Sequence, residues 1–205
     1  MLKIVLNFAV EEEWIESNPA SKMRLLKTGE WRAGTDEECA AFEARWPQGS
    51  MQRRAYSLAK YTGQRKSDLV LMTRADRKGG LLCVKQSKTD AEVHIPEHRE
   101  LIAELTRGNS EHISLLTTSQ GKAFDATYFG AWFAEAIEEA RLPEDCVLHG
   151  LRKTAARMLA EAGCSEEEIK AVTGHTTSTM VSYYTRAADK RKQATAAILK
   201  LENSK

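Results

Sequence analysis

The sequence predicts a mostly α protein with a small antiparallel β-sheet, of the α+β class. Helix-start signals recur along the chain at Thr35, Ser50 and Ser165, each followed by helically spaced apolar residues. Residues 81–96 hold two short apolar segments with strand character, separated by a polar turn. From His149 to the C-terminus the pattern is helical again, so helices outnumber strands in the predicted fold.

The N-terminal third of the chain reads as helices separated by turn signals. Residues 1–20 are amphipathic and end at Asn18-Pro19, because proline disfavours helix in the residue before it. Residues 20–34 resemble a linker. Thr35 and Glu38 form a capping box that starts the next helix, and Ser50 caps a third, which stops at Gly63.

The middle of the chain holds the predicted sheet. "RKSDLVLM" (65–72) should be helical again after Gly63, and the strands "LLCVKQ" (81–86) and "AEVHIP" (91–96) should pair through the turn "SKTD". Two further helices are expected over 97–108 and 125–141. The C-terminal helices should break at Gly163, at Gly174 and within the following Ser/Thr stretch.

Composition limits the class of protein. A chain of 205 residues with 42% hydrophobic and 29% charged residues suits one soluble domain, or one domain plus a fragment of another. No apolar run is long enough for a membrane span, and four scattered cysteines indicate a reduced, cytoplasmic protein. The net charge of +1 argues against a simple basic coat for nucleic acid, although residues 51–100 carry 11 basic and 6 acidic side chains.

Several residue pairs could bind phosphate, and each also has an ordinary structural interpretation. His149 and Arg152 share a helix face and suit phosphate oxygens, but surface pairs of this kind are common. Arg65 follows a turn at the start of a predicted helix, where solvated charge is usual, and Asp68 could orient its guanidinium. Lys88 lies at the hairpin tip, where it is either simply exposed or able to donate a proton to a ligand.

Other polar residues point less clearly to a site. His94 and His98 are separated by Pro96, which makes a helical metal pair unfavourable, so both are interpreted as structural. Helical spacing does not separate Tyr183 from Tyr184, since either could pack in a core.

One stretch resembles a helix-turn-helix. In "RMLAEAGCSEEEIKAVTGH" a helix is followed by a glycine and by a second helix capped by Ser165. Its first turn would present Glu166, Glu167 and Glu168 to DNA, and three carboxylates there oppose binding to a polyanion.

Five short motifs occur in a familiar order: "TGQRKSDL", "KQSKTD", "HGLRKTAA", "VTGH" and "YYTR". Together they resemble the catalytic domain of the tyrosine recombinase (phage integrase) family, over about Thr35 to Arg186. The resemblance implies the tyrosine recombinase catalytic-domain fold and a DNA breaking and rejoining enzyme, which would belong to a phage or another mobile element.

The resemblance also assigns a role to each matching residue. It implies Arg65 and Arg152 as the arginine pair that holds the phosphate, with His149 and His175 as further donors. It implies Tyr184 as the nucleophile that forms a 3′-phosphotyrosine, with Tyr183 only packing. Lys88 would protonate the departing 5′-oxygen, His149 would assist proton movement, and Asp68 would support Arg65 from behind. No metal or cofactor is implied.

Domains and partners follow from the same resemblance. Residues 1–34 would be the last helix (Leu2 to Ser17) and linker of an N-terminal DNA-clamping domain, so that the chain is either a piece of a longer protein or a shortened gene product. Residues 35–186 would be the catalytic domain, and 187–205 a helical tail that docks on a neighbouring subunit. The implied partners are double-stranded DNA, further copies of the chain in a tetramer on DNA (a monomer when free), and accessory DNA-bending proteins.

Two alternatives stay open at this point. A type IB topoisomerase shares this chemistry but relaxes supercoils. A non-catalytic DNA-binding remnant or helix-turn-helix module would need none of the six reactive residues, which are nevertheless all present.

Overall fold

The computed structural model describes residues 2–23, 31–107, 112–177 and 179–203. The chain divides into two compact units, Met1–Glu30 and Trp31–Lys205, here called the N-terminal unit and the main unit. Within the described residues, no helix is both long and apolar enough to cross a bilayer.

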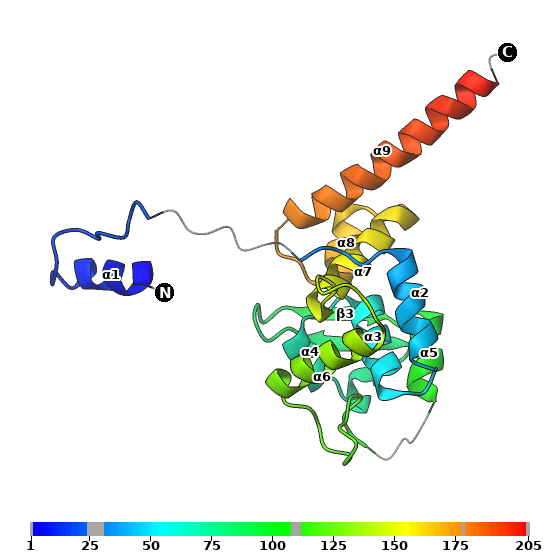
Figure 1. The fold of residues 1–205 in the computed structure, drawn as a ribbon, viewed down its shortest axis with the longest axis horizontal. Helices are drawn as coiled ribbons and strands as arrows, with labels where there is room; N and C mark the ends of the chain where they lie inside the picture. Colours follow the sequence, from blue (N-terminus) through cyan, green and yellow to red (C-terminus); the bar gives the residue numbers. More distant parts are fainter. Residues whose placement is uncertain (1, 24–30, 108–111, 178, 204–205) are drawn as a thin grey trace. The chain divides into compact units, whose positions relative to one another are not determined.

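In the described residues of the N-terminal unit there is one helix, α1 (Leu2–Glu11), coloured blue in Figure 1. The prediction that this helix reaches Asn18 is wrong, because Glu13 adopts a left-handed conformation with φ 58°. The Trp14 N–H then donates to the Ala9 carbonyl at 2.8 Å, which closes the helix end. Asn18 instead donates to the Lys3 carbonyl at 3.1 Å, so the chain folds back along α1.

Helices dominate the main unit, as the sequence predicts. They are α2 (Asp36–Arg45), α3 (Met51–Thr62), α4 (Lys66–Leu71), α5 (Arg99–Thr106), α6 (Ala126–Glu139), α7 (Leu148–Ala162), α8 (Glu166–Thr173) and α9 (Thr179–Glu202), with a 3₁₀ turn at Arg74–Asp76. The Thr35 capping box and the Ser50 and Ser165 caps are confirmed, and Ser165 also forms a capping box with Glu168. These helix starts depend on local hydrogen bonds, which is why the sequence predicts them well.

The sheet has three antiparallel strands in the order β1 (Arg77–Lys78), β2 (Leu81–Lys85) and β3 (Glu92–Pro96). The predicted hairpin is confirmed, with Cys83 opposite His94. Strand β1 was not predicted, because two polar residues carry no alternating pattern. One face of β2 and β3 is buried, since every second residue points into the core.

Two apolar clusters hold the main unit together. The larger lies between α2, α3, α4, α6 and the sheet, and includes the fully buried Leu58, Leu69 and Phe129. The smaller joins α7, α8 and α9 through Ala156, Ile169, Val181, Ala188 and Tyr184. This second cluster fixes the position of α9 against α7.

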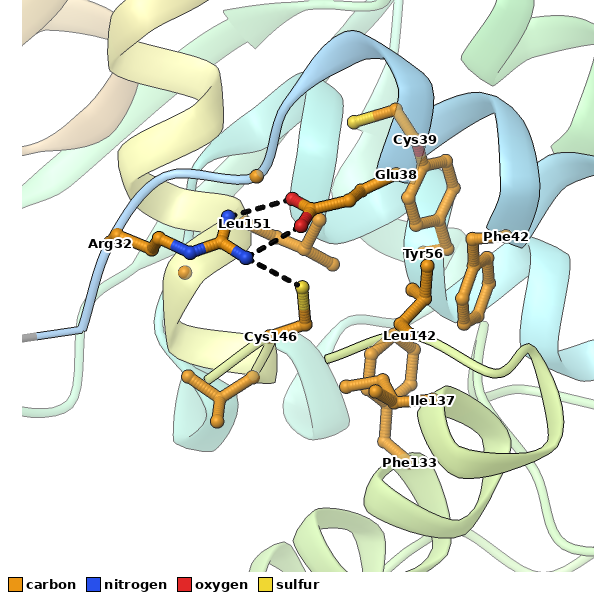
Figure 2. A pocket seen from close by; sticks show the side chains of 13 residues that line it. Arg32, Glu38, Cys39, Phe42, Tyr56, Phe133, Ile137, Leu142, Cys146 and Leu151 are labelled. Carbon is orange, nitrogen blue, oxygen red and sulfur yellow. Dashed lines mark hydrogen bonds and ion pairs between the residues drawn. The ribbon is translucent and has the colours of Figure 1, made fainter. Parts of the chain in front are cut away.

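Residues 31–34, the first of the main unit, cross α7 and are here called the Arg32 strap. Arg32 pairs with Glu38 at 2.5 Å and with Asp145 at 2.6 Å, and its hydrogen bonds lower the pKa of Glu38 to about 2. Figure 2 shows Arg32 directed at Glu38 and Cys146, beside a cavity of about 30 Å³ with apolar walls. Gly150 permits this close passage, because a Cβ there would lie 2.7 Å from the Arg32 carbonyl oxygen.

Candidate active site

Six polar side chains line one cavity of about 200 Å³ in the main unit: Arg65, His149, Arg152, Lys153, His175 and Tyr184. They come from the start of α4, from α7, from the segment after α8 and from α9. Five of the six reactive residues proposed from the sequence therefore meet at one place, and Lys88 is not among the residues that line it.

Arg65 is placed by a break between two helices. Gly63 ends α3 in a left-handed conformation with φ 62°, which confirms the predicted stop, and the helical residues that follow form a separate helix, α4, from Lys66. Arg65 is the N-cap of α4, and its Nη1 donates to Gln86 Oε1 at 2.9 Å. The guanidinium is thereby held by Gln86, at the base of the hairpin turn and next to the end of β2.

Asp68 lies behind Arg65 and is almost completely buried. Its Oδ1 accepts hydrogen bonds from both the backbone N–H and the hydroxyl of Ser87 at 2.8 Å. Its Oδ2 accepts no hydrogen bond and lies 4.0 Å from Arg65 Nη1. Asp68 therefore ties α4 to the hairpin turn and acts on Arg65 through its charge, while Gln86 makes the direct hydrogen bond.

Arg152 is a buried cation, only 3% exposed. Its Nη1 donates to the carbonyls of Gly63 and Thr173, each at 2.6 Å, and its Nε donates to His175 Nε2 at 3.2 Å. Its Nη2 has no hydrogen-bond partner.

The surroundings of Arg152 disfavour its charge. Burial, and then the nearby charge of Arg65, lower the pKa of Arg152 to about 10, with Asp68 opposing the shift in part. A buried cation with an unused donor beside a cavity is suited to receive an anion.

His175 is held as one neutral tautomer. Its Nδ1 lies 2.7 Å from the Thr173 hydroxyl, whose single hydrogen is donated to the Ile169 carbonyl. The hydroxyl must accept from Nδ1–H, so Nε2 is left to accept from Arg152. Burial, followed by the charges of Arg152, Arg65 and His149, lowers the pKa of His175 to about 4.

The lowered pKa of His175 predicts a pH dependence of stability. The folded-state pKa lies below the ordinary value of 6.5, so its contribution is fully present above pH 6.5 and is lost as the pH falls toward 4. Between pH 7 and pH 5, the free energy of unfolding of the wild type should fall by about 2 kcal/mol more than that of His175→Asn. Urea denaturation at both pH values measures this difference. Parallel losses in the two proteins would contradict it.

Four positively charged side chains surround His149, which lies exposed in the first turn of α7. Loss of hydration, and then the charges of Arg152, Lys153, Arg65 and Lys88, lower the pKa of His149. Lys88 is exposed in the hairpin turn, and its side chain does not line the cavity. Its charge nevertheless contributes to the lowered pKa of His149. Lys153 was missed in the sequence, because its only signal is that it follows Arg152.

The structure separates the two tyrosines. Tyr184 is 9% exposed and lines the cavity, while its ring packs in the cluster with Val181 and Ile169. Tyr183 is 65% exposed and is not among the residues lining the cavity, so the prediction that it packs in a core is wrong. The two rings meet edge to face with centroids 5.3 Å apart.

The remaining histidine candidates have local contacts. His94 Nδ1 lies 3.2 Å from Cys83 Sγ across the hairpin, and His98 caps α5 while stacking on Tyr61. Within the described ranges, no three His, Cys, Asp or Glu side chains are grouped to hold a metal ion.

Comparison with known proteins supplies the context for this site. Residues 38–191 match the model of the phage integrase family. The integrase of Mycobacterium phage L5 is 27% identical over 96% of the chain, and the chain spans 59% of that relative's length.

Solved structures give the same fold. Lambda integrase (residues 75–356) bound to DNA superposes with a TM-score of 0.73 at 25% identity, covering 90% of this chain and 70% of that one. A lambda integrase tetramer bound to a Holliday junction has a TM-score of 0.73 at 24% identity, covering 87% of this chain and 57% of that one.

Proposed function

The chain belongs to the phage integrase family, and from this premise we propose that residues 35–186 form the catalytic domain of a site-specific DNA recombinase. The observation that carries the proposal is the shared cavity, which holds Tyr184 together with two arginines and two histidines. A nucleophile beside several fixed donors is the arrangement that phosphoryl transfer needs.

In the proposed reaction, Tyr184 Oη attacks a DNA phosphorus and the bond from phosphorus to the 5′-oxygen breaks. The product is a 3′-phosphotyrosine and a free 5′-hydroxyl. His149 lines the same cavity as Tyr184 and is our candidate to receive the phenolic proton, since its lowered pKa favours the neutral form that can accept. Lys88 supplies a proton to the departing oxygen from the hairpin turn. Reversal of these steps on a new 5′-hydroxyl rejoins the strand.

The arginines stabilise the charge that develops on the nonbridging oxygens. Arg152 offers its unused Nη2, and Arg65 offers the part of its fork that does not bind Gln86. Two fixed guanidinium groups supply the charge that a metal ion supplies in other phosphoryl-transfer enzymes, so we propose that the reaction is metal-independent.

We extend the proposal to partners by analogy with the DNA-bound lambda integrase structures. The chain would act on double-stranded DNA as a homo-oligomer. Residues 1–34 would belong to a DNA-clamping domain, and residues 187–205 would dock on a neighbouring copy. Ile198 and Leu201 suit that role, because both are more than half exposed on α9, although α9 runs without a break through residue 187.

Incubation with supercoiled plasmid tests the proposal without knowledge of the target site. After a detergent quench in the presence of EDTA, we expect protein covalently attached to nicked DNA. Relaxed topoisomers with no joined recombinants would favour the topoisomerase alternative instead. Absence of an adduct, both from this chain and from a form extended by the preceding domain of a relative, would leave only a DNA-binding role.

A further inference from the structure

Gln86 is a fully buried polar side chain at the base of the hairpin turn. Its amide uses all four of its hydrogen-bonding positions. The oxygen accepts from Arg65 Nη1 and from the Thr89 hydroxyl, both at 2.9 Å. The nitrogen donates to Gln64 Oε1 at 2.6 Å and to the Thr173 carbonyl at 3.0 Å. A side chain with this many bonds has one allowed orientation.

These bonds connect Gln86 with both arginines of the site. Arg65 is bonded to it directly. Arg152 is bonded indirectly, because the Thr173 carbonyl that accepts from Gln86 also accepts from Arg152 Nη1 at 2.6 Å. One amide therefore sets the spacing of two guanidinium groups that come from different helices.

The same residue closes the turn that carries Lys88. The Gln86 carbonyl accepts from the Asp90 N–H at 2.9 Å, and the Gln86 N–H donates to the Ala91 carbonyl at 2.9 Å. The Thr89 hydroxyl adds a side-chain bond from inside the turn. The base of the turn is thereby anchored, while Lys88 itself stays exposed.

Gly174, in the "VTGH" motif, provides the space for this amide. A Cβ at that position would lie 2.1 Å from Gln86 Nε2, so any larger residue would displace the amide. The backbone at Gly174 is also left-handed, with φ 68°, which ends α8.

A glutamine suits this position because it is neutral and both donates and accepts. A glutamate would keep the bond to Arg65 but would lose both donors and set a negative charge against the Thr173 carbonyl and Gln64 Oε1. An apolar residue would leave Arg65 without its direct partner.

We propose that Gln86 is a positioning residue for the cleavage step, holding the Arg65 guanidinium and the Lys88 turn in register with Arg152. This inference rests on the proposed function, because it assigns Gln86 a role in that reaction. Gln86 acts through its neighbours and does not touch the DNA. A purely structural role of Gln86 would instead affect only folding. The positioning role and the structural role are separated by measuring whether the effects of substitutions at Gln86 and at Lys88 on the rate depend on each other.

The test is a double-mutant cycle with Gln86→Met and Lys88→Met. The measured quantity is the rate of plasmid adduct formation at saturating protein, and each rate is corrected for the fraction of that variant that is folded. Gln86→Met alone should lower the rate by roughly 10- to 100-fold. The fold-loss of rate in the double variant should be at least about fivefold smaller than the product of the two single fold-losses. The reason is that both changes disable the same group, the Lys88 side chain, which Gln86→Met misplaces and Lys88→Met removes.

Val84→Ala serves as the matched control. Val84 is buried in β2, which leads into the turn, and its apolar side chain cannot hydrogen-bond the Gln86 amide, so its loss should multiply with that of Lys88→Met. If Gln86→Met fails to fold, Thr89→Val removes one bond to the amide and should lower the rate about threefold or more. Fully multiplicative losses, or a rate within about twofold of wild type, would overturn the inference. A wild type that forms no adduct, both as this chain and in the form extended by the preceding domain of a relative, would instead refute the proposed function.

Discussion

Replacing Tyr184 by phenylalanine should abolish the covalent protein–DNA adduct, while Tyr183→Phe should leave its yield within about twofold of wild type. Of the two tyrosines, only Tyr184 lines the cavity with Arg65 and Arg152, and phenylalanine lacks the hydroxyl oxygen that the proposed phosphotyrosine bond needs. Detergent-quenched plasmid reactions, resolved on a denaturing gel, measure the adduct directly.

Tyr184→Phe should still fold, because its ring stays in the cluster with Val181 and Ile169. Loss of the hydroxyl should change the free energy of unfolding by about 1 kcal/mol, within the range of a single hydrogen bond. Thermal denaturation of both variants provides the control. An adduct that persists in Tyr184→Phe and disappears in Tyr183→Phe would contradict the assignment.

Arg152→Lys should lower the rate of adduct formation by about 10²- to 10³-fold although the charge is kept. A lysine cannot bond the Gly63 carbonyl, the Thr173 carbonyl and His175 at once while also presenting a donor to the cavity. The variant should also be less stable, so the rate is compared at equal folded fraction.

Arg157→Lys is the matched control for that substitution. Arg157 lies on the same helix and pairs with Asp36 and Glu161, at 2.6 and 2.9 Å, but does not line the cavity. It should lose stability without a comparable loss of rate. Equal losses of rate in the two variants would show that Arg152 contributes only to folding.

The parts of the fold that the sequence predicts well depend on short-range physics. The Thr35 and Ser165 caps each involve residues three positions apart, and the hairpin depends on alternation within five-residue strands. The end of α1 was missed because Glu13 adopts a left-handed conformation, which is uncommon for a residue other than glycine.

The site was only partly predictable for a different reason. The ordered motifs pointed to the residues that line the cavity, but spacing could not separate Tyr183 from Tyr184, since both fit a helix. Exposure separates them, and exposure depends on how α9 packs against α7. Gln86 and Lys153 were missed because a buried amide and a neighbouring lysine acquire meaning only from the side chains that other helices bring to them.

The Arg32 strap has a consequence for the position of His149. Arg32, at the start of the main unit, makes two ion pairs within that unit, one of them to Asp145, just ahead of α7. The Arg32 carbonyl rests on Gly150, the residue next to His149. Substitution of Arg32 should therefore disturb the turn of α7 that bears His149, although Arg32 itself does not line the cavity of about 200 Å³.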